Sequence, residues 1–484
     1  MFKKGKRLIA MAMAAAMALS LCACNSGSNG GGTASGGDDM SEEVTLKWYI
    51  MAQEPAGFDR VMEEANKYLK EKLNVNLELV CIQAGDYQQK TQMIMASQEE
   101  FDLMWMNSTY FEPSVTKGAF IPLDELLDTT PELKSMFDEG VWDATRVNGD
   151  IFGVPMLQVL HDQPGLWFIK SIVDKYDLPV EEIQSLDDLT PIYQTVKDNE
   201  PSDVIPIRGT IATNFRPYMT TVTGTSFSID ENGQVTNRRE EDIEENSKMQ
   251  EWYAKGFFPA DVTTLTDENS LVKAGKIFSR YSRQLPGVSG KFEISNGFSV
   301  VNVPTRDAII SRSSVQSTMT AVSATSNHPE RALKLLELMQ TDKYLFNLMA
   351  YGIEGQDWEK DPENENRILR DSGAYYVPEY LIGNQFLAYI LPSYEDTVWE
   401  ETIAENAAAA VDPNNSFSFD RTPVETELTN LTAIDTEYKN QLAYSTTPVE
   451  ELYAEIDEKQ SLAGVDKVVE EIQTQYDTWK AQQQ

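Results

Sequence analysis

Two periods of hydrophobic and polar residues alternate along the first part of the folded chain. Residues 44–51 are mostly apolar and residues 75–81 are apolar at every second position, which indicates β-strands. The apolar residues within 58–73 recur at helical spacing, residues 87–97 predict a second helix, and residues 101–106 return to a strand-like run. This β-α-β-α-β order predicts a parallel sheet with helices on its faces.

Later segments carry the same kinds of signal less regularly. Residues 151–155 read as a short strand that ends in a turn, and residues 167–169 read as a strand that leads into a helix at 171–176. Pro329 marks the start of a further helix, because proline fits the first helical turn. Apolar residues at helical spacing over 465–479 predict a C-terminal helix that packs on the body of the protein.

The N-terminal segment predicts secretion with a lipid anchor. A basic stretch over 3–7 precedes an uncharged apolar run over 8–21, which is short for a membrane span and typical of a signal peptide. The segment Leu21-Cys22-Ala23-Cys24 resembles a bacterial lipobox, with Cys24 as the lipidated residue and 1–23 as the signal peptide. Cys22 fits this role less well, and a cleaved signal followed by an unmodified cysteine is the alternative.

The segment that follows predicts a flexible tether over residues 24–43. Its residues 25–39 are almost entirely Gly, Ser, Asn, Thr, Ala and Asp, which bury too little apolar surface to order themselves. Cys81 is the only cysteine after Cys24, so no internal disulfide is expected in the mature chain. No later apolar run reaches the length of a membrane span, so the lipid anchor is the only expected membrane attachment.

Length and charge narrow the class of protein. A chain of 484 residues suggests two or three domains. Its 40 Lys and Arg residues against 77 Asp and Glu residues give a formal net charge of −37. This balance argues against a nucleic-acid partner, whose phosphates require a basic face. The negative net charge is typical of a solvated acidic surface on a protein outside the cytoplasm.

The order of several short motifs then resembles a known family. The motifs are Thr45–Tyr49, Phe101–Leu103, Lys117–Leu123, Gly153–Pro155 and the stretch from His328–Ala332 to Tyr351–Gly355. In this order, behind a lipobox, they are similar to the extracellular solute-binding proteins of ABC importers, of the larger carbohydrate-associated type. Further motifs in the last third are Gly383–Phe386, Phe417–Asp420 and Ala463–Trp479. These resemble the lipoprotein branch of that family with a DUF3502-type C-terminal region.

The resemblance implies a two-lobed α/β fold of the periplasmic-binding-protein type II. Each lobe would be a mostly parallel sheet flanked by helices, and hinge crossovers would join the two lobes. We expect lobe 1 to comprise residues 44–155 and 305–355, and lobe 2 to comprise residues 156–304 and 356–484. The two lobes would close on a ligand between them.

A sugar site requires flat aromatic faces for the ring C–H groups and carboxylates, amides and guanidinium groups for the hydroxyls. Ligands of parallel sheets bind beyond the carboxyl ends of the strands, so the loops after Met51 and Met106 are the first candidates. Each candidate also has a packing or ion-pair interpretation, Arg216 and Arg283 in particular. The candidate ligand-binding residues are Tyr49, Glu54, Trp105, Asn107, Tyr110, Trp167, Arg216, Tyr281, Arg283, Trp358 and Asn384.

An enzyme is the main alternative class. The chain has two histidines, and it lacks a G-x-S-x-G turn, an H-E-x-x-H motif, a Cys/His metal cluster and a Walker loop. We therefore expect no catalytic residue, no metal and no cofactor. Paired carboxylates for glycoside hydrolysis remain open, so a surface-anchored lipoprotein that binds or hydrolyses glycosides is the second hypothesis. A structural or adhesive surface lipoprotein is the third.

The hypothesis from sequence is thus a monomeric binding protein held by lipid on the outer face of a bacterial cell membrane. It would capture a small polar solute, a mono- or oligosaccharide, and deliver it to the permease subunits of an ABC importer. A peptide or an anionic sugar acid is an alternative ligand.

Overall fold

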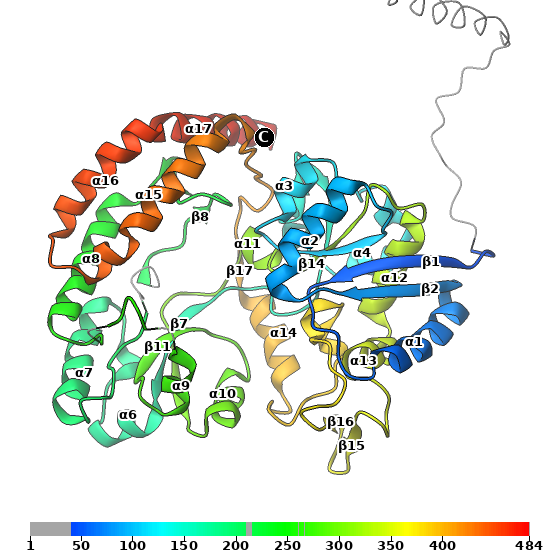
Figure 1. Ribbon diagram of the computed structural model, residues 1–484, viewed down its shortest axis with the longest axis horizontal. Coiled ribbons are helices and arrows are strands. Elements are labelled where there is room, and N and C mark those ends of the chain that lie inside the picture. Colours follow the sequence, from blue (N-terminus) through cyan, green and yellow to red (C-terminus); the bar gives the residue numbers. More distant parts are fainter. Residues whose placement is uncertain (1–39, 210–214, 260, 266, 484) are drawn as a thin grey trace, which may run out of the picture. The chain divides into compact units, whose positions relative to one another are not determined.

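The first sheet contains five strands and shows why the alternating pattern at the start of the chain arises (Figure 1). In spatial order they are β2 (Val75–Cys81), β1 (Val44–Ile50), β3 (Leu103–Met106), β14 (Met319–Val322) and β6 (Gly153–Pro155). β2, β1 and β3 run parallel, which confirms the predicted β-α-β-α-β unit. β14 is antiparallel to both of its neighbours.

Helix α1 (Phe58–Leu73) illustrates how the apolar stripe builds this unit. Its buried residues Val61, Met62, Ala65 and Leu69 lie on one face, and the remaining positions are polar or only partly covered. The second connection is α2 (Ala84–Ser97).

The structure, a computed structural model, describes residues 40–209, 215–259, 261–265 and 267–483. The described residues belong to one compact unit, Met40–Gln484. The predicted signal peptide, Cys24 and most of the predicted tether lie outside them.

The first hydrophobic core extends along the chain well beyond this sheet. It takes in residues 44–160 and then residues 310–399. The sequence-based division assigned 356–484 to lobe 2, whereas the packing places Trp358 to Trp399 in the first core. The reason is α13 (Lys343–Tyr351), which is buried over its whole last two turns and needs cover from the chain that follows it.

The other elements of the first body are short helices and hairpins. They are α3 (Phe111–Thr116), α4 (Pro131–Ser135), α5 (Glu139–Asp143), β4 (Arg146–Val147), β5 (Asp150–Ile151), α11 (Arg312–Val315), α12 (Pro329–Thr341), β15 (Glu359–Asp361), β16 (Asn364–Leu369) and α14 (Val398–Ala408).

The second body is built on a three-stranded sheet in the order β11 (Ser279–Arg283), β7 (Pro164–Ile169) and β12 (Val300–Pro304). All six residues of β7 are buried, as a central strand requires. This sheet is antiparallel, so of the two larger sheets only the first, through β2-β1-β3, has the expected parallel arrangement. The expectation assumed that the helix-connected parallel pattern of residues 44–106 also holds in the second body. There, however, both strands next to β7 are antiparallel to it.

Helices of the second body surround this sheet and form its hydrophobic core with it. They are α6 (Lys170–Tyr176), α7 (Leu186–Asn199), α8 (Arg239–Ala254), α9 (Glu268–Lys273) and α10 (Val288–Asn296).

Three C-terminal helices, α15 (Glu425–Tyr444), α16 (Val449–Ala463) and α17 (Val465–Gln482), lie together beside α8 (Figure 1). The hydrophobic core beneath these helices also contains Phe417 and residues from the segment 222–229. That segment lies nearly two hundred positions before α15 in the sequence. That earlier segment belongs to a small sheet of β8 (Thr220–Thr221), β9 (Ser228–Ile229) and β10 (Val235–Thr236).

The chain passes between the two bodies at three places that hydrogen-bond to one another. Asp162 bridges Ile309, with Asp162 N donating to Ile309 O at 2.8 Å and Ile309 N donating back at 3.1 Å. β13 (Ile309–Ile310) then pairs in parallel with β17 (Ala410–Val411). We call these three hydrogen-bonded segments the crossover ribbon.

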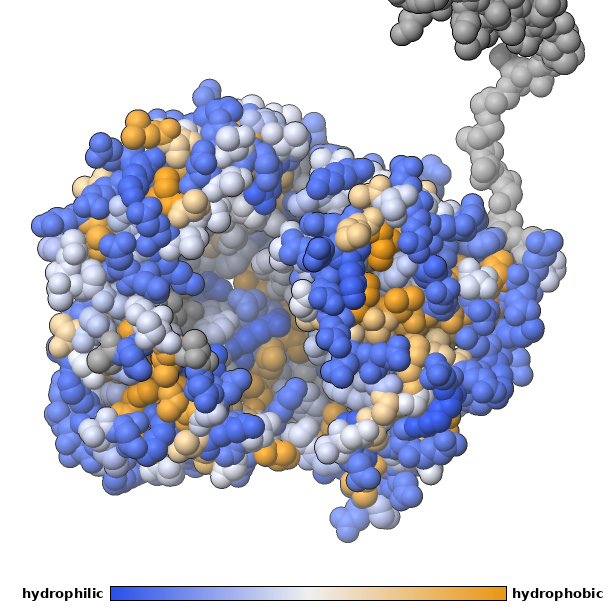
Figure 2. Space-filling model, viewed as in Figure 1, coloured by the Kyte–Doolittle hydropathy of each residue, from blue (hydrophilic) through white to orange (hydrophobic). Residues whose placement is uncertain are grey.

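Hydrophilic residues cover most of the face of Met40–Gln484 that Figure 2 shows, and this face is hollowed beside the α15–α17 helices. Over the described ranges, no helix combines the length and the apolar character needed to cross a membrane.

Candidate ligand-binding site

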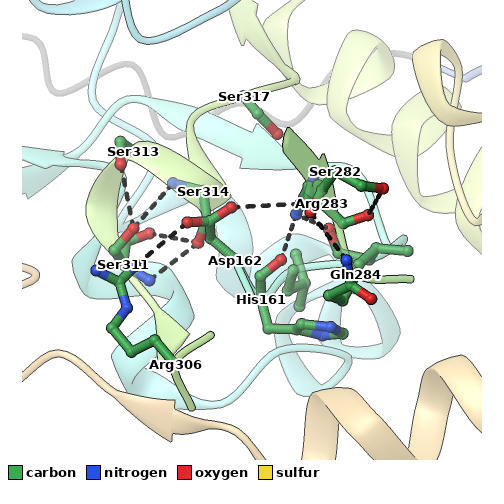
Figure 3. Close-up of polar contacts among 12 residues, drawn as sticks. His161, Asp162, Ser282, Arg283, Gln284, Arg306, Ser311, Ser313, Ser314 and Ser317 are labelled. Atoms are coloured by element: carbon green, nitrogen blue, oxygen red, sulfur yellow. Dashed lines mark hydrogen bonds and ion pairs between the residues drawn. The ribbon is translucent and has the colours of Figure 1, made fainter. Parts of the chain in front are cut away.

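The crossover ribbon brings four side chains together at the point where the bodies join. Tyr281 and Arg283 lie two positions apart on β11, so both stand on one face of that strand. Asp162 lies 3.6 Å from Arg283 Nε and 3.6 Å from Arg306 Nη2. Figure 3 shows the two arginines on opposite sides of this one carboxylate. We call Asp162, Tyr281, Arg283 and Arg306 the crossover cluster.

Arg283 is held in place mainly by backbone carbonyls. Its Nη2 donates to the carbonyl oxygen of His161 and, at 3.5 Å, to that of Val159, both in the first crossover. Burial lowers the pKa of this guanidinium, and the Asp162 carboxylate acts in the opposite direction. Its Nε is buried and has no hydrogen-bond partner among the described residues, and Asp162 is the carboxylate that faces it. About a third of the Arg283 side chain remains exposed, which is the part that a ligand could reach.

Tyr281 supplies the exposed aromatic face of the cluster, because 41% of its surface is accessible. Partial burial raises the pKa of its hydroxyl, and Asp162 adds to that rise, so the phenol is neutral and can donate. Such a ring offers an apolar face and a polar edge to the same ligand.

A second tyrosine continues the site on the side of Arg306. The Arg306 guanidinium lies 5.5 Å from the ring centre of Tyr218, within cation–π range. The Tyr218 hydroxyl donates to Asp412 Oδ2 at 2.5 Å, and the Thr220 hydroxyl donates to Asp412 Oδ1 at 2.8 Å. Burial, together with Asp412, raises the pKa of Tyr218. Asp412 directly follows β17, so this network ties the third crossover to the second body.

His161 connects the first crossover to α14. Its side chain is fully buried, its Nδ1 lies 3.0 Å from Asn406 Oδ1, and its Nε2 lies 3.4 Å from Glu405 Oε2. Burial lowers the pKa of the imidazole, which favours the neutral form.

The first body adds polar and aromatic groups near the crossovers. Gln158 Nε2 donates to Ser317 Oγ at 3.5 Å, and Thr318 Oγ1 donates to the backbone oxygen of Tyr380 at 3.4 Å. The Tyr380 side chain is 43% exposed. Lys291 of α10, in the second body, donates to the hydroxyl of Tyr394 at 3.4 Å. A ligand at the crossovers would therefore find groups from both bodies.

Five of the sequence candidates are structural. The rings of Trp105, Trp167 and Trp358 are at most 6% exposed, and all three pack against aromatic side chains. Asn384 caps a short helical turn through Phe386 N and donates to Gln340 O. Arg216 is paired with two carboxylates on α8, Asp242 and Glu245. The three Trp rings are thus largely covered, and the polar groups of Asn384 and Arg216 already have partners within the protein.

Four other candidates lie at or near the ends of the first strands. Tyr49 is 6% exposed and its hydroxyl donates to Glu99, and burial raises its pKa to about 12. Glu54 is exposed in the loop after β1. Asn107 donates to the Tyr110 hydroxyl at 3.1 Å, and both side chains are half-buried beyond the end of β3. Of the candidates, the structure thus brings Asn107 and Tyr110 into contact and places Tyr281 and Arg283 on one face of β11.

Sequence reasoning omitted Asp162, Arg306, Tyr218 and Tyr380 from the candidate list. Tyr218 lies two residues after the candidate Arg216, and Arg306 lies two residues after the end of β12. Asp162 and Tyr380 carry no signal in the spacing of residues, because the crossovers alone bring them to the site. Within the ranges that the structure covers, no group of three or more His, Cys, Asp or Glu residues could hold a metal ion.

Comparisons with known proteins agree with this architecture. The sequence model of the family described as bacterial extracellular solute-binding protein matches residues 51–345. A model described as a domain of unknown function (DUF3502) matches residues 413–481, the region of α15–α17. A carbohydrate ABC transporter substrate-binding protein of Streptococcus pneumoniae serotype 4 is 26% identical over 455 residues, which make up 91% of this chain and 91% of that protein.

Solved structures have the same fold. The N-glycan transport solute-binding protein (NgtS) of Streptococcus pneumoniae is 24% identical, with a TM-score of 0.80 over 91% of this chain and 100% of that chain. The same protein in complex with Man5GlcNAc gives a TM-score of 0.69 at 25% identity, over 91% of this chain and 99% of that chain.

Proposed function

Because this chain belongs to the family of bacterial extracellular solute-binding proteins, we propose that it captures an oligosaccharide and delivers it to an ABC importer. Its fold is the two-lobed type II fold of solute-binding proteins. The ligand would lie over the crossover cluster, with Tyr281 against a sugar ring and Asp162, Arg283 and Arg306 bonded to hydroxyls. The observation that carries the proposal is this cluster, a half-exposed ring beside loosely paired charges where the two bodies meet.

The relatives support a saccharide as the ligand class. One structure of the pneumococcal relative holds Man5GlcNAc and another holds Man1GlcNAc. Neutral saccharides offer hydroxyls, which suit the guanidinium groups and carboxylate of the crossover cluster, and apolar ring faces, which suit Tyr281. A peptide or an anionic sugar acid is the second ligand class, since two guanidinium groups share one carboxylate there.

Closure of the two lobes on the ligand is part of the proposal. The TM-score to the pneumococcal relative falls from 0.80 to 0.69 when that relative carries Man5GlcNAc. Movement about the crossover ribbon would explain such a change, because hydrogen-bonded crossovers can bend while both cores stay intact. The division into lobes would then run at residues 156–163, 305–311 and 409–416.

Attachment and delivery complete the proposed role. Cys24 would carry the lipid, and the tether up to residue 43 would hold a monomer beside the importer permease on the outer face of the membrane. Ligand contacts that favour the closed form would let the permease distinguish loaded from empty protein.

A thermal-shift and calorimetric screen with the mature protein tests the function. Man5GlcNAc, Man1GlcNAc, acidic oligosaccharides and peptides would each be added at increasing concentration. We expect a saccharide to raise the melting temperature, because a ligand that binds only the folded state stabilises it by mass action. Failure of every saccharide and peptide to do so would refute the proposal, as would hydrolysis of glycosides at an enzyme-like rate.

A further inference from the structure

A groove of about 760 Å³ lies between α2 and α3 on the first body, away from the crossover cluster. Tyr110, just beyond the carboxyl end of β3, lies among its lining residues, as does Phe101, just before the same strand. The groove therefore runs alongside β3, from its carboxyl end, where ligands of such sheets bind, to its amino end.

No described residue that lines the groove carries a carboxylate, although the protein is strongly acidic. Asp and Glu make up 77 of the 484 residues, yet none of the 16 described lining residues is acidic. The only charged lining residue is Lys117, which forms no ion pair with any described residue. Most of the rest carry amides, hydroxyls or small apolar groups. This lining suits an uncharged polar ligand better than a cation.

Helix α2 presents unengaged amides to the groove. Only Tyr87 and Thr91 of its 14 residues are buried, so the helix covers the body with a narrow face. Gln88 and Gln92 are four residues apart and stand on one side of the helix. Their side-chain amides, and that of Gln98, make no hydrogen bond to a described residue. Each free amide offers two donors and an acceptor, which match the hydroxyls of a saccharide.

We propose that the α2–α3 groove is an extension subsite that takes the outer sugar residues of a long or branched neutral oligosaccharide. Tyr110 provides the ring face at the end nearest the cluster, and the three glutamine amides bond the hydroxyls along the groove. This inference rests on the proposed function, in which the inner part of the same saccharide lies over the crossover cluster.

The test compares two probes of different size, Man5GlcNAc and Man1GlcNAc, by calorimetry on the full mature chain. In the variant Gln88→Ala/Gln92→Ala we expect the affinity for Man5GlcNAc to fall about tenfold, since two hydrogen bonds of ordinary strength are lost. The affinity for Man1GlcNAc should stay unchanged. A second variant, Ala96→Trp, fills the groove with a ring and should weaken the binding of Man5GlcNAc in the same selective way.

The matched control is Gln89→Ala, which removes the same amide from an exposed position of α2 that does not line the groove. It should bind both probes as the unmodified protein does. Equal affinities for Man5GlcNAc in all variants would overturn the subsite, as would unchanged binding combined with slower uptake by cells, which would assign the groove to the importer. If the unmodified protein binds neither probe nor any other saccharide, the proposed function itself fails.

Discussion

Two arginine sites at the crossovers use the same chemical groups in opposite ways. Arg312, at the start of α11, is 6% exposed and its Nε donates to Glu112 Oε1 at 2.6 Å. Its other nitrogens donate to the carbonyl oxygens of Asn415 at 2.8 Å and Arg146 at 2.6 Å. In the crossover cluster, by contrast, Arg283 and Arg306 share Asp162 at 3.6 Å, and about a third of the Arg283 side chain is exposed.

The difference separates a structural charge from a charge available for recognition. The donors of Arg312 that are engaged join the first body, the second crossover and the third crossover, so no ligand could reach them without breaking the fold. The two arginine–Asp162 distances exceed a normal hydrogen bond, and 32% of the Arg283 side chain and 21% of the Arg306 side chain remain exposed. A ligand hydroxyl that reaches the exposed part of either guanidinium would not have to displace a short hydrogen bond to Asp162.

The sharpest test of this contrast is Arg312→Met. Removing one partner of a buried ion pair leaves Glu112 uncompensated, and we expect the free energy of unfolding to fall by about 3–5 kcal/mol. Denaturant titration of the mature protein would measure it. The double variant Glu112→Met/Arg312→Met should regain part of the loss, because it removes the orphaned carboxylate. The variant Arg283→Gln serves as the reference from the crossover cluster. If Arg312→Met and Arg283→Gln had equal free energies of unfolding, the contrast between the two arginine sites would be wrong.

Arg216 extends the contrast to α8 of the second body. This predicted ligand residue donates to Asp242 and Glu245 on α8, with its side chain 10% exposed. We expect Arg216→Gln to lower the free energy of unfolding by about 2 kcal/mol, because charge-assisted hydrogen bonds are lost. Saccharide affinity, measured by calorimetry on the folded fraction, should remain unchanged. Loss of affinity without loss of stability would return Arg216 to the ligand site.

Tyr281→Ala tests the crossover cluster, the site in this comparison that is available for recognition. The saccharide affinity should fall about tenfold, equivalent to ~1.4 kcal/mol, because the exposed ring of the crossover cluster is removed. The free energy of unfolding should change by less than about 0.5 kcal/mol, since Tyr281 is 41% exposed and belongs to neither hydrophobic core. Tyr281→Phe serves as the control, because it keeps the ring and should retain most of the affinity. Similar affinities for all three proteins would place the ligand elsewhere.

His161 gives the smallest expected effect, a dependence on pH. Burial lowers the pKa of His161 below that of the unfolded chain, about 6.5. Between the folded and unfolded pKa values the unfolded chain binds more protons, so the free energy of unfolding should decrease as the pH falls below about 6.5. In the variant His161→Gln this part of the decrease should vanish. Denaturant titrations at pH 7.5 and pH 5.5 measure it, and equal decreases in both proteins would contradict it.

The local periods of the sequence predict the first strands and helices well because each period reports which face of an element is buried. The same periods cannot say which way a strand-end aromatic points. Trp105 follows the logic of a ligand residue beyond a parallel strand, yet its ring turns to Tyr87 and Thr318 in the core. Trp167 stands in a central strand whose two faces are both covered, so its ring packs on Phe292.

The site itself depends on contacts between distant segments, which no local pattern records. Asp162 and Arg306 come from two different crossovers, and Arg283 comes from a third segment, β11. Asp162 pairs with both arginines. Tyr281 and Arg283 are predictable from sequence because, with Arg280, they form a short cluster of basic and aromatic residues. Likewise, the order of apolar segments does not reveal that residues 358–399 return to the first core, because that return follows from the need to cover α13.

The discontinuous first core has a consequence for the order of folding. It needs residues 44–160 together with residues 310–399, so it cannot close until more than three quarters of the chain is present. Apart from Ala443, the core of the second body comes from residues 166–303, which are encoded between these two parts and can collapse before them. Closing so long a loop costs chain entropy and slows folding. We therefore expect the intervening body to form first and the terminal segments to complete the other one around the crossover ribbon.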